Sequence, residues 1–252
     1  MRHWLLPLTI LATPLPALPT HAQEVDLELV LLADASGSID QAEIDFQRQG
    51  YAEAITHPDV LYAIASTLTG SIAVTYVEWA ANQAVVVDWT IIATPEDATD
   101  FATDLLLPPR LASGRNAIGA ALLEGKRLIE ENQIIGLRRV IDFSGDSANN
   151  WSGPSIAEAR DTVLAAGITI NGLPILRPGS STSGGGDIVQ LYADRIIGGP
   201  GAFLVPADTG ARFTEAVRRK LILEIAGSAP EVQPTAARRA GVHPRPHPLI
   251  AR

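Results

Sequence analysis

The sequence predicts an α/β fold of the Rossmann-like, doubly wound type, with a mostly parallel central sheet and one antiparallel edge strand. Apolar runs at residues 27–33 and 139–143 end in polar residues, and each is followed by a turn and a helical pattern. This is the rhythm of parallel strands joined by helices. Residues 71–79 and 83–89 are rich in Val, Ile, Thr and aromatic side chains, and the gap between them is too short for a crossover helix. They therefore form an antiparallel hairpin.

The other elements follow in order along the chain. Helical patterns cover residues 41–56 after the first strand, 95–106 after the hairpin, 117–131 before the second apolar run, 154–166 after it, and finally 209–225. Short apolar stretches at 168–173 and 202–205 complete the strands. Residues 177–186 contain Ser-Ser-Thr-Ser-Gly-Gly-Gly and form a loop, and the sequence does not decide whether that loop has a function.

The N-terminus has the pattern of a signal peptide. Met1, Arg2 and His3 precede an apolar stretch. The stretch is followed by small residues at the positions that a signal peptidase prefers, and we expect cleavage after Ala22. An uncleaved anchor is the alternative, although the stretch is short for a membrane span and is interrupted by prolines. We expect a signal peptide over 1–22, one globular domain over 24–227, and export to the periplasm or secretion. The absence of cysteine is compatible with an oxidising compartment.

The charge is unevenly distributed. The formal net charge of the chain is −9, while the predicted signal peptide and the segment 228–252 are both net positive, so the domain itself is strongly acidic. An acidic body argues against nucleic acid or an anionic membrane as the main partner. Residues 228–252 are rich in proline with scattered arginines, and we expect a disordered tail that is either a passive extension or a docking arm.

A group of hard-metal ligands follows the first predicted strand. Asp34, Ser36 and Ser38 are spaced by two, so that one tight loop turns a carboxylate and two hydroxyls toward a common point. Such oxygens suit Mg²⁺, Mn²⁺ or Ca²⁺. The alternative is a polar turn in which Asp34 or Ser38 caps the following helix.

Two further loops bring oxygen ligands toward the same point. Asp146 comes just after the strand over 139–143, and Asn116 precedes the helix over 117–131. Open α/β sheets bind ligands in the crevice at the carboxyl ends of their strands. If the first and fourth strands are neighbours, Asp34 and Asp146 face each other across that crevice.

These residues resemble a von Willebrand factor A (vWA) domain with a metal-ion-dependent adhesion site. Asp34, Ser36 and Ser38 match the Asp-x-Ser-x-Ser loop of that family, and Asp146 matches the Asp after its fourth strand. Asn116 stands where the family usually has Thr, and an amide oxygen also ligates hard cations. Four strings, at residues 76–79, 141–146, 170–173 and 197–203, further resemble a bacterial family of exported proteins built on this domain and without an assigned activity.

The resemblance implies a binding module. A divalent cation, Mg²⁺ in the first place and Mn²⁺ or Ca²⁺ otherwise, is expected on Ser36, Ser38 and Asn116, with Asp34 and Asp146 often acting through water. An open coordination position then accepts a carboxylate from a partner protein. Glu78, Ser144, Asn149 and Trp151 are expected to support the site or to face that partner, and Glu78 is either an acceptor for the Asp34 loop or a surface charge.

No catalytic residue is predicted. The only histidine outside the signal peptide and tail is His57, far from the strand ends, and neither Ser36 nor Ser144 sits in a Gly-x-Ser-x-Gly elbow. A metal-dependent hydrolase using the same site is one alternative function. A vWA scaffold that binds no metal is the other.

Overall fold

The computed structural model describes residues 22–177, 187–208, 210 and 212–227. The strands are β1 (Gln23–Asp34), β2 (Ile72–Trp79), β3 (Gln83–Ile92), β4 (Ile134–Gly145), β5 (Thr169–Leu176) and β6 (Ala207–Asp208). The helices are α1 (Gln41–Ile55), α2 (Pro58–Ala65), α3 (Pro95–Leu106), α4 (Ile118–Glu131), α5 (Ile156–Ala165), α6 (Ile188–Arg195) and α7 (Phe213–Ala226). The predicted signal peptide up to His21, the tail and most of the loop over 177–186 lie outside the described residues.

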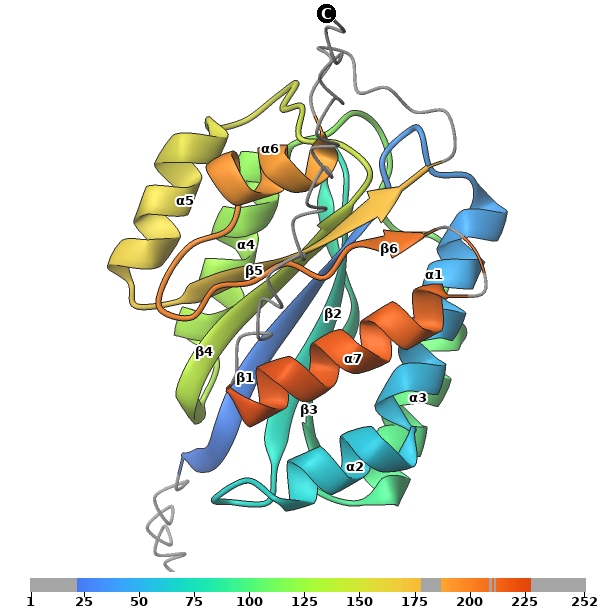
Figure 1. Cartoon of the computed structure of the whole chain (residues 1–252), viewed down its shortest axis with the longest axis vertical. Coiled ribbons are helices and arrows are strands. Elements are labelled where there is room, and N and C mark those ends of the chain that lie inside the picture. The colour runs from blue at the N-terminus through green and yellow to red at the C-terminus, as the bar shows by residue number, and fades with distance from the viewer. Residues whose placement is uncertain (1–21, 178–186, 209, 211, 228–252) are drawn as a thin grey trace, which may run out of the picture.

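These strands form one sheet in the order β3-β2-β1-β4-β5-β6. All pairs are parallel except β2 and β3, which form the predicted antiparallel hairpin at one edge. The predicted fold class is confirmed: helices lie on both faces of a mostly parallel sheet (Figure 1). From β1 the chain adds β2 and β3 on one side, and later β4, β5 and β6 on the other. The strand order therefore reverses between β1 and β4, which is where open α/β sheets bind ligands.

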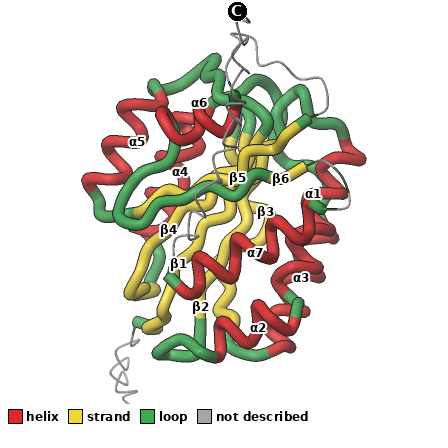
Figure 2. Tube along the Cα trace, viewed as in Figure 1, coloured by secondary structure: helices red, strands yellow, loops and turns green. Residues whose placement is uncertain are grey.

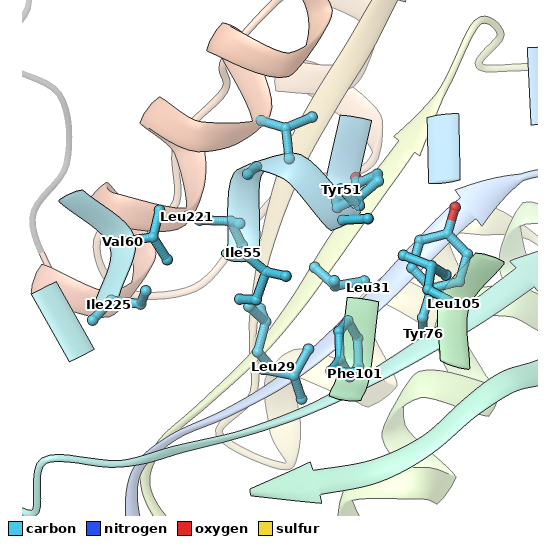
Figure 3. Packing of buried hydrophobic residues seen from close by; sticks show 14 of the residues in the cluster. Leu29, Leu31, Tyr51, Ile55, Val60, Tyr76, Phe101, Leu105, Leu221 and Ile225 are labelled. Carbon is cyan, nitrogen blue, oxygen red and sulfur yellow. The ribbon is translucent and has the colours of Figure 1, made fainter. Parts of the chain in front are cut away.

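Two cores hold the layers together, one on each face of the sheet. Alternate residues of β1 point to opposite faces: Leu29 and Leu31 pack with α1, α2, α3 and α7, while Val30 and Leu32 pack with α4, α5 and α6. Figure 3 shows the first of these cores, in which Tyr51 and Tyr76 meet edge to face at 5.4 Å. A strand buried on both faces cannot slip in register without exposing one set of side chains, which fixes the position of its C-terminal end.

Local signals account for where several helices begin. Asp40 and Glu43 form a capping box at the start of α1, and Thr94 with Asp97 and Ser155 with Glu158 do the same for α3 and α5. Helices α2 and α6 were not predicted from the sequence. Pro58 at the first position of α2 and Asp187, which caps α6, were the signals that could have found them.

The last strand lies later than predicted. Strand β6 is Ala207–Asp208 rather than 202–205. Residues 203–205 do run beside β5, but they join it through an isolated bridge between Gly172 and Leu204, bonds to the backbone of Gly172 and a bond from the Phe203 N–H to the side chain of Asn171, without forming a named strand. No helix in the described part of the chain combines the length and apolar character needed to cross a membrane.

Candidate metal centre

The carboxyl ends of β1 and β4 bring the predicted ligands together. Asp34 is the last residue of β1, and Asp146 follows Gly145, the last residue of β4. The two strands pair in parallel, with Leu32 opposite Phe143. The loops that leave the strands gather at this end of the sheet (Figure 2). The expectation that Asp34 and Asp146 lie on neighbouring loops is therefore met by the sheet order.

The oxygen atoms of these loops form a chain of short contacts. The Ser36 and Ser38 hydroxyls are 3.3 Å apart, and the Ser38 hydroxyl donates to Asp146 Oδ1 at 3.5 Å. Ser36 is fully buried and Ser38 is exposed, so the cluster runs from the interior to the mouth of the crevice. The oxygen atoms of Ser36 and Asp146 lie closer than the ~8 Å beyond which one cation with bonds of ~2.0–2.6 Å could not join them through a water molecule.

Asp34 forms the buried base of the cluster. Its Oδ1 accepts from the Ser36 backbone N–H at 2.8 Å, and its Oδ2 accepts from the Asp146 N–H at 3.4 Å. A side chain at Gly145 would come within 2.8 Å of that Oδ2, so glycine permits the close approach of β4 to the carboxylate.

The electrostatics of the two acids favour a positive charge at this position. Burial, and then the negative charge of Asp146, raise the pKa of Asp34 from 3.8 to about 7. Burial likewise raises the pKa of Asp146, although the guanidinium of Arg177 opposes the shift. Two acids near each other with little solvent are stabilised in their charged forms by a cation beside them.

The loop that carries Asn116 is joined by backbone hydrogen bonds to the loops of Ser36 and Asp146. The Gly37 N–H donates to the carbonyl of Gly114 at 2.8 Å, and the Trp151 N–H donates to the carbonyl of Asn116 at 2.9 Å. Gly114 has a φ of 103°, which favours glycine. Within the described part of the chain, no hydrogen bond joins the Asn116 side chain to the other four predicted ligands. The loop carrying Asn116 thus bridges the loops of Ser36 and Asp146.

A basic residue absent from the sequence analysis lies at the mouth of the cluster. Arg177, just after β5, contacts Asp146 Oδ2 through Nε at 2.7 Å and Glu43 Oε1 through a terminal nitrogen at 2.9 Å. Nothing in the sequence near Arg177 marks it as a neighbour of Asp146, because the contact arises from the order of β4 and β5 in the sheet.

Another arginine missed in the sequence shapes the Asp34 loop. Arg110 donates to the backbone carbonyls of Ala35, of Ser36 at 3.1 Å and of Ile39 at 2.9 Å. These bonds hold the backbone carbonyls of the loop and do not use its hydroxyls, of which that of Ser38 donates to Asp146. Pro108, Pro109 and Arg110 gave no sequence signal beyond that of a loop.

Glu78 supports the Asn116 loop rather than the Asp34 loop. Its side chain is 1% exposed, which excludes a surface charge, and it pairs with Arg48 at 2.6 Å. Its other oxygen accepts from the N–H groups of Leu111 at 2.8 Å and Ala112 at 3.3 Å. The expected acceptor role is present, but toward a different loop.

The other predicted supporting residues divide between interior and rim. Ser144 is fully buried and donates to the carbonyl of Leu32 at 3.2 Å, so it lies inside the sheet and not toward a partner. Asn149 is half-buried, and its N–H donates to the Ser147 hydroxyl at 3.1 Å. Trp151 is 63% exposed, with the guanidinium of Arg115 5.3 Å from its ring centre.

The donor set fits a hard cation. Carboxylate, hydroxyl and amide oxygens are what Mg²⁺, Mn²⁺ and Ca²⁺ take as ligands. Among residues that the structure describes, no three His, Cys, Asp or Glu side chains gather into a group able to hold a metal ion. A cation at this site therefore depends on the hydroxyls of Ser36 and Ser38 and the amide of Asn116 in addition to the two carboxylates.

Solved structures share this fold. Proximal thread matrix protein 1 from the mussel byssus is similar over 81% of this chain and 47% of its own, with a TM-score of 0.56 and 14% identity. The von Willebrand factor type A protein from Catenulispora acidiphila is similar over 80% and 42%, with a TM-score of 0.53 and 14% identity. The pilus adhesin SpaC from Lactobacillus rhamnosus GG is similar over 81% and 30%, with a TM-score of 0.55 and 13% identity.

The mussel protein has also been solved with a zinc-occupied MIDAS motif, in a structure similar over 78% of this chain and 46% of its own, with a TM-score of 0.53 and 14% identity. The chain spans about half or less of the length of these proteins. At such identities the likeness shows the fold alone, which is that of von Willebrand factor A domains.

The chain belongs to the family described as "Protein of unknown function (DUF1194)", which matches residues 24–229. A search of the curated proteins found no match.

Proposed function

We propose that this protein is an exported binding module that holds a divalent cation and, through it, a carboxylate of a protein partner. Asp34, Ser36, Ser38, Asn116 and Asp146 are the residues that hold the cation in this proposal. The bound cation supplies an open coordination position that attracts an acidic side chain and fixes its direction. Mg²⁺ is the first choice, since every ligand is a hard oxygen donor.

The observation that carries the proposal is the continuous run of oxygen atoms from Ser36 through Ser38 to Asp146, closed at its base by Asp34. Each of these residues belongs to a loop whose backbone is held by bonds to another loop or to an arginine. A site whose ligands are fixed before the ion arrives binds it without first ordering the chain.

The rim of the site has the character of a protein contact. Trp151 and Arg115 are exposed, and they stack beside Asn116. Tryptophan and arginine are the residues most enriched at the energetic centres of protein interfaces. The Gly119 N–H donates a second bond to this loop, to Asn150 Oδ1 at 3.2 Å, and this bond restrains the loop of Trp151. An exposed aromatic on a restrained loop favours a partner protein over a small solute.

Binding is favoured over catalysis by the same observations. His57, the histidine weighed in the sequence, caps α2 and bonds the Asp59 N–H at 3.1 Å, at the opposite end of the sheet from the predicted metal ligands. The similar mussel matrix protein and pilus adhesin are named for structural and adhesive roles. We therefore place the metal-dependent hydrolase and the metal-free scaffold behind the binding module.

Isothermal titration with Mg²⁺, Mn²⁺ and Ca²⁺ tests the cation. We expect saturable heat with the wild type and at least tenfold weaker binding for Asp146→Asn and Ser36→Ala, since the first removes a negative charge and the second a ligand oxygen. Asp161→Asn, which removes an exposed acid on α5, is the matched control and should bind like the wild type. Equal heats in the wild type and all three variants would show that Asp146 and Ser36 do not bind the cation, and would contradict the proposed metal site.

Export has its own experiment. We propose cleavage after Ala22, which leaves Gln23, the first residue of β1, as the mature N-terminus. Mass spectrometry of the protein recovered from periplasm and medium should give the mass of residues 23–252. An intact N-terminus in the membrane fraction would instead support the uncleaved anchor.

A further inference from the structure

A cavity lies directly beside the candidate metal centre. It has a volume of about 300 Å³ and is enclosed by the first turns of α1, the end of β5 and the start of α7. In Figure 1 these three segments meet at the end of the sheet that carries the loops. Its lining combines the apolar side chains of Ile39, Phe46, Ile175 and Phe213 with polar side chains, among them Gln47, Glu43 and Arg177.

The apolar walls are only partly covered by the protein itself. Phe46 packs against Phe213 with ring centres 5.3 Å apart, yet Phe46 remains 39% exposed. Ile39, Ile175 and Phe213 are buried. A cavity of this size accepts one aromatic or branched aliphatic side chain, and covering exposed apolar surface gains roughly 25 cal/mol per Å².

The charged groups of the rim are already satisfied. Glu43 accepts from the Asp40 N–H at 2.9 Å and pairs with Arg177 at 2.9 Å, while Asp40 accepts from the Glu43 N–H at 2.9 Å. The acids of the rim therefore need no basic ligand, and the apolar side chains of the lining favour an uncharged, apolar occupant. Gln47 also lines the cavity, and its Oε1 is buried without a hydrogen-bond partner among the described residues.

One side chain connects the cavity to the metal centre. The guanidinium of Arg177 contacts Glu43 on the cavity rim and Asp146 among the predicted ligands. The carboxylates of Glu43 and Asp146 therefore lie on either side of the same guanidinium group, each in direct contact with it. Consecutive Cα atoms are about 3.8 Å apart, so a segment that places a carboxylate at the cation reaches the cavity with a residue one to three positions away.

We propose that the partner segment pairs its cation-binding carboxylate with a nearby aromatic or branched aliphatic side chain, which occupies this cavity. The inference rests on the proposed function, because the carboxylate on the cation positions the segment. It adds the chemistry of the second contact and thereby a sequence requirement for the partner: an Asp or Glu with an apolar residue within three positions.

Peptide binding tests the inference on the mature full-length protein. Fluorescence anisotropy would compare labelled hexapeptides that carry one Asp and one Phe, one to three positions apart, with the same peptides carrying Ser in place of Phe, in Mg²⁺ and in EDTA. We expect at least one Phe peptide to bind about tenfold more tightly than its Ser counterpart, and only in Mg²⁺.

A matched pair of variants locates the contact. Ala42 lines the cavity and is exposed, so Ala42→Trp fills the cavity mouth without disturbing the core, and Ala42→Leu fills it less. Both should reduce the Phe preference, Ala42→Trp more strongly, while the Mg²⁺ titration stays unchanged. Gln41→Trp adds the same bulk at the preceding exposed position, which is not part of the cavity lining, and should bind like the wild type.

The outcomes separate the inference from the function beneath it. If the Phe and Ser peptides bind equally well and both need Mg²⁺, the cavity does not receive the apolar side chain, and the proposed function still stands. Absence of Mg²⁺-dependent binding by every peptide overturns both. Phe-peptide binding that persists in EDTA, or a Mg²⁺-induced dimer in size-exclusion chromatography that Ala42→Trp abolishes, assigns the cavity to an independent ligand or to a second copy and overturns the inference.

Discussion

The guanidinium of Arg177 lies 2.7 Å from the carboxylate of Asp146, the acid that the sequence assigns to a metal ion. A guanidinium and a divalent cation are like charges, and they compete for the same carboxylate. Occupation of the site by a cation therefore works against this ion pair, and Arg177 retains Glu43 as its second carboxylate.

Removal of this competitor should strengthen cation binding. Arg177→Gln is expected to raise the affinity for Mg²⁺ by about twofold to fivefold, the effect of one partly exposed ion pair. Isothermal titration measures the change. Arg115→Gln, which removes an equal charge from the Trp151 side of the rim, serves as the control and should alter the affinity less. Weaker binding by Arg177→Gln would instead make Arg177 a support of the site.

The oxygen at position 116 should decide whether the site binds metal. Asn116→Thr presents a hydroxyl and should keep Mg²⁺ binding, whereas Asn116→Val has nearly the same shape as Thr without the oxygen and should lose at least tenfold in affinity. The two variants should unfold at similar temperatures in EDTA. If Val and Thr bind Mg²⁺ equally well, residue 116 is not a ligand.

Glu78 should contribute to stability through the loop that carries Asn116. Glu78→Ala leaves Arg48 buried without its partner and two N–H groups without an acceptor, so we expect a loss of about 3–5 kcal/mol in the free energy of unfolding. Urea denaturation measures it. The double variant Glu78→Ala with Arg48→Met should be less destabilised than the two single losses together, because it leaves no unpaired charge. Additive losses would contradict a coupled pair.

The buried acids behind β4 should make stability depend on pH. Asp142 points to α7 and pairs with Lys220 at 2.6 Å. Lys220 also pairs with Glu224 at 2.5 Å. Burial raises the pKa of Glu224 from 4.5 to about 7. Between these two values the folded protein holds a proton that the unfolded chain has released, so stability falls as the pH rises through that window.

The variant Glu224→Gln isolates this contribution. Its stability relative to the wild type should increase by about 1–3 kcal/mol between pH 5 and pH 8, since the amide does not ionise. Urea denaturation at several pH values gives the difference. Glu215→Gln, an exposed acid on the same helix, is the control and should show little trend. A difference that stays flat with pH would show that Glu224 is ionised throughout.

Local patterns in the sequence were sufficient for much of the fold. The apolar runs of β1 and β4, the short gap between β2 and β3 and the Asp34, Ser36 and Ser38 spacing are all properties of neighbouring residues, and the structure has the predicted sheet and hairpin. Helices α2 and α6 were missed because each has only eight residues and therefore little periodicity.

The surroundings of the candidate site required the tertiary structure. Arg110 and Arg177 reach the loops of Ser36 and Asp146 from 74 and 31 positions away in the chain, and no local pattern encodes such contacts. Glu78 accepts hydrogen bonds from Leu111 and Ala112 because the end of β2 lies beside the loop that contains these two residues. The sequence by itself determined which oxygen donors stand at the strand ends. The order in which the strands pack decided which charges face them, because electrostatic neighbours depend on distance in space and not along the chain.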